Sequence, residues 1–116
     1  MSTVVIYHNP RCSKSRATLQ LLEQRGIAPT VVEYLNQPPT TEQLRQILDL
    51  LGKTPREIIR RGEAEYKANN LDNADLSDDQ LIDAIAANPK LLERPIVLAN
   101  GKAAIGRPPE NVLNIL

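Results

Sequence analysis

The chain has 116 residues, of which 41% are hydrophobic and 24% charged, with 14 basic and 14 acidic side chains. This length predicts a single domain over residues 1–116, with a core that needs no disulfide or metal. The balanced charge excludes a general attraction to nucleic acid or to a membrane surface, and three tyrosines without Phe or Trp leave little for base stacking.

The cellular compartment is indicated by Cys12 and by what the first residues lack. Cys12 is the only cysteine, so an internal disulfide is excluded and a reducing compartment is favoured. The chain does not start with a basic segment and a long apolar stretch, which are typical of a secretory signal. No apolar run approaches membrane-spanning length. The sequence therefore predicts a cytoplasmic protein.

The first third of the chain predicts two strands with a helix between them. Residues 3–7 and 30–35 are rich in β-branched residues, which is typical of short strands. Residues 13–25 have helical periodicity and are followed by Gly26. The inward face of this helix is expected to carry Ala17, Leu19, Leu21 and Leu22. A β-α-β unit of this kind gives a parallel pair of strands through a right-handed crossover.

Three helices are predicted in the middle of the chain. The first begins at Thr40 or Thr41 and ends at Gly52. The second covers residues 54–62 and has a proline at its first helical position. The third covers residues 77–89, after a polar segment that predicts a loop with one turn of helix.

The last part of the chain predicts a β-hairpin and a final helix. Residues 94–106 place two apolar strands around Asn100-Gly101, which is a strong hairpin signal. The final helix is expected to turn Leu113 and Leu116 inward. The whole pattern predicts an α/β protein with a mixed four-stranded sheet and helices on both faces, which is the thioredoxin-like architecture.

Cys12 stands where a thiol would be reactive. It follows the first predicted strand and precedes a helix, and the N-terminus of a helix favours negative charge. Arg11, Lys14 and Arg16 are basic neighbours, and His8 lies four residues earlier. The same helix end can hold an oxyanion. The alternatives are a small buried thiol, a structural histidine and solvated basic side chains.

The residue three positions after Cys12 is Ser15, where a dithiol motif would have a second cysteine. The chain therefore cannot form a disulfide within itself. Redox turnover at Cys12 must borrow a thiol from another molecule, such as glutathione or a redox protein. One cysteine and one histidine are not a recognised metal-ligand set, so no metal and no bound cofactor is expected.

Three further arginines, Arg60, Arg94 and Arg107, lie close to predicted element boundaries. In a thioredoxin-like sheet the start of the third strand packs beside the N-terminus of the first helix, and Arg94 lies at that start. Its bond to Pro95 is a candidate cis peptide. Guanidinium groups offer paired planar donors that suit tetrahedral oxyanions.

The segment YHNPRCSKSR resembles the H-N-P-x-C-x-x-S-R segment of the glutaredoxin-dependent arsenate reductases, which have a thioredoxin fold. The resemblance continues through EYLNQPPT, REIIRRGE, DDQLIDAIAANP, RPIVL and GRPPE, and covers almost the whole chain. Two features depart from the pattern. Arg11 adds a charge before the cysteine, and the chain ends at Leu116, as expected of a short chromosomal member rather than a plasmid type with a C-terminal extension.

The resemblance implies an enzyme that reduces arsenate to arsenite. It implies that Cys12 is the nucleophile. It also implies that His8 and Ser15 are catalytic residues, with His8 supporting the environment of Cys12 and Ser15 donating a hydrogen bond to the thiolate. It also implies three oxyanion ligands, Arg60, Arg94 and Arg107. Glutathione and glutaredoxin are the implied reductants, and neither a metal nor a nucleotide is required.

Two other functions remain open from the sequence. Proteins similar to the Spx transcription regulators bind RNA polymerase, but many carry a C-x-x-C switch that Ser15 excludes, and they typically lack the arginine found here at Arg107. A glutathione-dependent thiol reductase with another substrate is the second alternative.

Overall fold

The computed structural model describes residues 3–116, which divide into two compact units. The first unit contains residues 3–37 and 94–116, and the second contains residues 38–93. The single domain predicted from the chain length remains a prediction. Within the described residues, no helix is long and apolar enough to cross a membrane.

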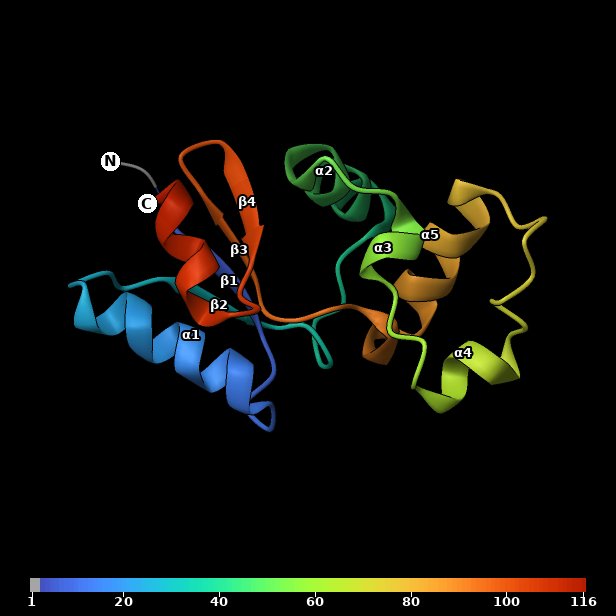
Figure 1. Cartoon of the computed structure of the whole chain (residues 1–116), viewed down its shortest axis with the longest axis horizontal. Coiled ribbons are helices and arrows are strands. Elements are labelled where there is room, and N and C mark those ends of the chain that lie inside the picture. The colour runs from blue at the N-terminus through green and yellow to red at the C-terminus, as the bar shows by residue number, and fades with distance from the viewer. Residues whose placement is uncertain (1–2) are drawn as a thin grey trace. The chain divides into compact units, whose positions relative to one another are not determined.

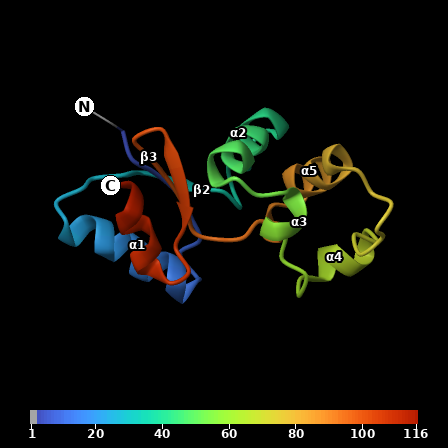
Figure 2. The same cartoon turned by 45° about the horizontal axis from the view of Figure 1, so that its top comes forward.

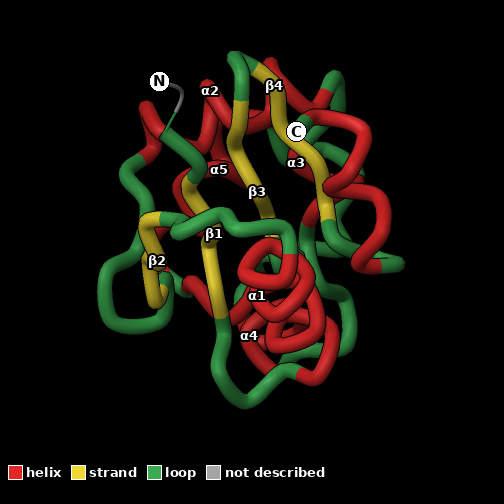
Figure 3. The backbone as a smooth tube through the Cα atoms, turned by 90° about the vertical axis from the view of Figure 1, so that its left-hand side faces the viewer, coloured by secondary structure: helices red, strands yellow, loops and turns green. Residues whose placement is uncertain are grey.

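The first unit is built on a four-stranded sheet with the order β2-β1-β3-β4 (Figure 3). Its strands are β1 (Val5–His8), β2 (Thr30–Glu33), β3 (Ile96–Ala99) and β4 (Lys102–Ile105). β1 and β2 run parallel, whereas β3 is antiparallel to both β1 and β4. The predicted mixed sheet and the hairpin are confirmed. The hairpin turn places Asn100 and Gly101 at positive φ, as a type I′ turn requires.

Two helices pack on one face of this sheet, α1 (Ser13–Gln24) and the 3₁₀ helix η2 (Pro109–Ile115) (Figure 1). Their shared core with the sheet consists of Ile6, Leu22, Val97, Ala99, Val112 and Ile115. Burial of these aliphatic side chains supplies the main stabilisation of the unit, since it contains no disulfide among its described residues. The core holds α1 against β1, and the loop between them carries Cys12.

The inward face of α1 carries Leu19, Leu21 and Leu22, as predicted, but not Ala17. Ser15, Thr18 and Leu22 are buried, whereas Ala17 is exposed. Thr18 is accommodated because its hydroxyl donates to the carbonyl oxygen of Lys14 at 2.8 Å. Apolar periodicity missed the two polar positions because hydrogen bonds within the protein satisfy their hydroxyl groups.

The final helix was predicted in the right place but with the wrong inward residues. It is a 3₁₀ helix, with three residues per turn, so Val112 and Ile115 share its buried face. Leu113 is only partly buried and Leu116 is exposed, contrary to prediction.

The second unit is helical, and Figure 2 gives a second view of its helices. It contains α2 (Thr41–Leu51), α3 (Pro55–Ile58), α4 (Ala64–Ala68), α5 (Asp78–Ala87) and the 3₁₀ helix η1 (Pro89–Leu91). Thr40 and Ser77 cap α2 and α5, each in a reciprocal pair with a glutamine three residues later. The helices pack through aliphatic side chains that are almost completely buried from solvent. These include Leu44, Ile47, Leu81 and Ile85.

The helix predicted over residues 54–62 is shorter than expected. α3 ends at Ile58 because Ile59 forms an antiparallel bridge with Leu92. Two backbone hydrogen bonds fix this bridge, Arg60 N to Leu91 O at 2.7 Å and Glu93 N to Ile58 O at 2.8 Å. The bridge therefore fixes the position of the Arg60 backbone, from which the side chain extends.

Candidate active site

Cys12 is the N-cap residue of α1, at the end of a tight loop that follows β1. Its backbone N–H donates to Asn9 O at 3.0 Å, and its carbonyl accepts the first helical hydrogen bond from Arg16 N at 3.0 Å. The Asn9 side chain accepts from Arg11 N at 3.0 Å, which tightens the loop further. The Cys12 residue as a whole is 9% exposed. The predicted position of Cys12 is confirmed.

The surroundings of the Cys12 sulfur favour its ionised form. Burial alone would raise the pKa of the thiol. The backbone N–H of Ser15, a hydrogen bond and positive charge from Arg94, and the backbone N–H of Lys14 outweigh it and leave the pKa below its ordinary value. The thiolate is the nucleophilic form of cysteine. The site therefore supports nucleophilic attack closer to neutral pH than a free thiol would.

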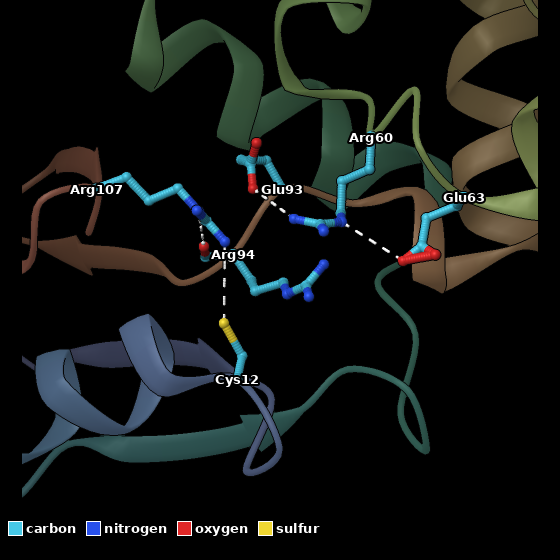
Figure 4. Close-up of polar contacts among 6 residues, drawn as sticks. All are labelled: Cys12, Arg60, Glu63, Glu93, Arg94 and Arg107. Atoms are coloured by element: carbon cyan, nitrogen blue, oxygen red, sulfur yellow. Dashed lines mark hydrogen bonds and ion pairs between the residues drawn. The ribbon is translucent and has the colours of Figure 1, made fainter.

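Two arginines from the far end of the chain lie at the sulfur (Figure 4). Arg94 precedes β3 and Arg107 follows β4, and both are joined to the next proline by cis peptide bonds. Arg107 Nη2 is 3.9 Å from Cys12 Sγ. The cis bond at Arg94–Pro95 was predicted, whereas the second one, Arg107–Pro108, was not. The grouping of Arg94 and Arg107 with Cys12 was expected and is observed.

Gly106 holds the segment before Arg107 close to the rest of the site. Its N–H donates to Pro95 O at 2.9 Å. A Cβ atom here would overlap Thr18 Oγ1 and lie 2.8 Å from Pro95 Cγ. Sequence reasoning missed this close approach, although the glycine beside Arg107 was a signal for it. The position admits no side chain without displacement of its neighbours.

His8 and Ser15 form a buried pair beneath the Cys12 loop. His8 Nδ1 lies 2.6 Å from Ser15 Oγ, which also accepts from Asn9 N at 3.0 Å. Burial lowers the pKa of His8; Glu33 opposes this shift and Arg16 adds to it. The lowered pKa favours the neutral imidazole, whose Nδ1 can accept the Ser15 proton. The sequence singled out both residues, and the structure brings them together.

The Ser15 hydroxyl forms hydrogen bonds with His8 and Asn9, whereas the Ser15 backbone N–H acts on Cys12. A hydrogen bond from the hydroxyl to the thiolate remains a prediction. The pair with His8 instead orients the first turn of α1, whose N–H groups lower the pKa of the thiol.

Arg60 belongs to the second unit, where two carboxylates hold its guanidinium (Figure 4). Nη1 lies 3.1 Å from Glu93 Oε1, and Nε lies 3.6 Å from Glu63 Oε1. The Arg60 side chain is 25% exposed. Sequence reasoning named Arg60 but neither glutamate, since isolated acidic residues give no signal of their partners.

Taken together, the first unit presents one activated thiol and two guanidinium groups. A thiolate is a nucleophile, and arginines stabilise the charge of a tetrahedral oxyanion. Within residues 3–116, no group of three or more His, Cys, Asp or Glu side chains is arranged to hold a metal ion.

Comparison with known proteins agrees with this chemistry. Residues 7–115 match the ArsC family. An arsenate reductase of Neisseria meningitidis is 55% identical over an alignment of 117 positions, which covers all of both chains. The uncharacterized protein YfgD of Escherichia coli is 56% identical over 97% of this chain and 96% of its own. An arsenate reductase from Vibrio cholerae has a solved structure with a TM-score of 0.95, 55% identity and 98% coverage of both chains.

The fold and the site define a thioredoxin-like protein with a single cysteine, whose pKa is lowered by its surroundings. The chain belongs to the ArsC family, as the match over residues 7–115 and the full-length relatives show.

Proposed function

We propose that this protein is an arsenate reductase that uses Cys12 as its nucleophile. The observation that carries the proposal is the lowered pKa of a lone thiol at a helix N-terminus, with Arg94 and Arg107 beside it. Arsenate reductases of 55% identity over the full chain support the choice of substrate.

The first step joins sulfur to arsenic. The Cys12 thiolate attacks arsenate, a sulfur–arsenic bond forms, and one arsenic–oxygen bond breaks as that oxygen takes up two protons and leaves as water. Arg94 and Arg107 would hold the remaining oxygens and offset their negative charge. No electron has yet moved, because arsenic remains pentavalent in the adduct.

The reduction needs two further thiols, because the chain has only one cysteine. Glutathione replaces a second arsenic-bound oxygen, which leaves as water. The thiol of glutaredoxin then attacks the glutathione sulfur and forms a mixed disulfide, while the electron pair of the broken arsenic–sulfur bond remains on arsenic and reduces it to the trivalent state. Water releases arsenite and restores the Cys12 thiolate. Glutathione and glutaredoxin imply a cytoplasmic site of action.

Arg60 is proposed as the third oxyanion ligand. Its ion pairs with Glu63 and Glu93 hold the guanidinium in a defined position, although they also compete with an anion for its donors. Arg60→Lys keeps the charge but loses the planar paired donors, so we expect a higher KM for arsenate. An unchanged KM in this variant would remove Arg60 from the substrate site.

The test is arsenate-dependent consumption of NADPH by the purified protein with glutathione, glutaredoxin and glutathione reductase. Cys12→Ser should reduce this activity to background and leave the circular dichroism spectrum unchanged, because serine is nearly isosteric but far less acidic. Ser13→Ala, at the exposed neighbouring position, is the matched control and should retain full activity.

Residual arsenate reduction by Cys12→Ser would exclude Cys12 from the mechanism. The wild type could also show no arsenate-dependent activity although its Cys12 is rapidly alkylated near neutral pH. This result would support an activated thiolate but contradict arsenate as the substrate.

A further inference from the structure

A cavity of about 330 Å³ lies in the first unit, on the β2 side of the Cys12 loop. Residues 8–11 form one wall, and Glu33, Leu35 and Asn36 form the other. His8 and Glu33 are direct partners in the parallel ladder of β1 and β2. The cavity therefore opens at the ends of these two strands. Cys12, the proposed nucleophile, is the residue that follows Arg11 in the loop.

The cavity presents one anion and one cation that are not engaged with each other. Glu33 and Arg11 are both exposed. Among the described residues neither side chain forms an ion pair, and the Arg11 contact to Asn9 uses only the backbone N–H. Groups of opposite charge around one small cavity match a ligand that carries both signs.

The proposed reaction requires a small thiol beside the Cys12 sulfur, and Cys12 directly follows Arg11, a residue that lines the cavity. The arsenic adduct on Cys12 must be attacked by a thiol that the chain does not contain. Glutathione ends in a γ-glutamyl group, which carries an ammonium and a carboxylate on one carbon atom. A cavity beside the Cys12 loop with one carboxylate and one guanidinium is complementary to such an amino-acid group.

We propose that this cavity binds the γ-glutamyl end of a peptide thiol such as glutathione, with Glu33 at the ammonium and Arg11 at the carboxylate. The proposal rests on the proposed function, because it places the second thiol of that reaction. Asn36 adds amide hydrogen-bonding groups, and Leu35 packs against the aliphatic part of the ligand. The bound peptide then lies next to the loop that holds Cys12.

The binding test uses S-methylglutathione, which has no free thiol and cannot support reduction. NMR titration of the full chain should show saturable shifts confined to residues 8–11 and 33–36. Glu33→Gln and Arg11→Gln should each weaken the affinity by roughly two- to fivefold, as loss of an exposed ion pair implies. Glu23→Gln and Arg25→Gln, at exposed positions of α1 and its C-cap that do not line the cavity, are the matched controls and should bind as the wild type does.

A second ligand assigns the ammonium contact. S-Methylglutathione that lacks its α-amino group should bind the wild type and Glu33→Gln equally, whereas Arg11→Gln should still weaken it. An equal effect of Glu33→Gln on both ligands would contradict the pairing of Glu33 with the ammonium.

The outcomes separate this proposal from the function on which it rests. Arsenate reduction without saturable S-methylglutathione binding overturns the cavity proposal and leaves the reductase in place. Saturable binding at residues 8–11 and 33–36 without arsenate reduction supports the cavity and rejects arsenate as substrate. If Glu33→Gln and Arg11→Gln raise the KM for glutaredoxin but leave S-methylglutathione binding unchanged, the cavity serves the protein partner and the proposal fails.

Discussion

Arg107 donates from Nε to the backbone carbonyl oxygen of Arg94 at 2.9 Å, and its Nη2 faces Cys12 Sγ at 3.9 Å. One guanidinium therefore ties the strand that follows Arg94 to the thiol. Arg94 itself acts on the sulfur through its side chain. The two arginines differ in what they contribute, and this difference can be measured.

Arg94→Ala should slow both arsenate reduction and Cys12 alkylation by iodoacetamide, because Arg94 lowers the pKa of the thiol. Arg107→Ala should slow arsenate reduction more than alkylation by this neutral reagent. Loss of a hydrogen bond to a charged group costs about 1.5–3 kcal/mol, which is roughly ten- to hundredfold in kcat/KM. Equal losses in both assays for Arg107→Ala would mean that Arg107 tunes the thiolate or the fold instead of holding the oxyanion.

The stability of the protein should depend on pH through Cys12. Burial opposes ionisation, but the N–H groups of Ser15 and Lys14 together with Arg94 lower the pKa of the folded thiol below that of the unfolded chain. A lowered folded pKa stabilises the folded state above the unfolded pKa, and this contribution disappears as the pH falls through the folded pKa. Urea unfolding of wild type and Cys12→Ser should therefore show a difference that grows with pH. A constant difference between the two proteins would contradict a lowered pKa.

Ser15→Ala should destabilise the first unit. The substitution leaves His8 Nδ1 and Asn9 N without the partner that the hydroxyl provides, and a buried group without its hydrogen bond costs about 1–3 kcal/mol. The thermal midpoint should fall, and the iodoacetamide reaction of Cys12 should require a higher pH because the first turn of α1 is less well oriented. Ser13→Ala removes an exposed hydroxyl two residues earlier and should leave both measurements unchanged.

Gly106→Ala should cost about 1–3 kcal/mol of stability, as overpacking of a filled site does. The new methyl group would overlap Thr18 Oγ1 and crowd Pro95. The KM for arsenate should rise, because Arg107 is the next residue. Gly62→Ala, where a Cβ would have open space, is the control and should leave the KM for arsenate unchanged. Recovery of stability in Gly106→Ala combined with Thr18→Ala would identify the Thr18 contact as the cause.

The main elements of the fold could be predicted because their signals are local. Short β-branched runs, capping residues and the Asn100-Gly101 turn each determine their own conformation, and they placed all four strands. Local patterns did not reveal that Ile59 pairs with Leu92, which is a contact between distant residues and ends α3 at Ile58. The spacing of inward residues in the last helix depends on its 3₁₀ geometry, which the same pattern does not distinguish.

The residues of the candidate site could be predicted where they have reactive or charged side chains. They could not be predicted where their role is to allow close packing. Cys12 and the arginines could be named from residue type and position. Thr18 and Gly106 could not, because their importance arises from a close approach between α1 and the segment after β4. In the sequence Glu33 has no assigned role and Arg11 is noted only as a charge beside Cys12, and only the fold places the two residues around one cavity.

The separation of Cys12 and Arg107 by 95 positions has a consequence for protein synthesis. The ribosome adds about 5–20 residues per second, so the thiol leaves it roughly 5–20 s before the arginine does. During most of this interval Cys12 lacks both guanidinium groups and reacts as an ordinary cysteine. Full activation of the thiol thus depends on the last part of the chain. A truncated translation product that lacks this part would contain a cysteine of ordinary reactivity.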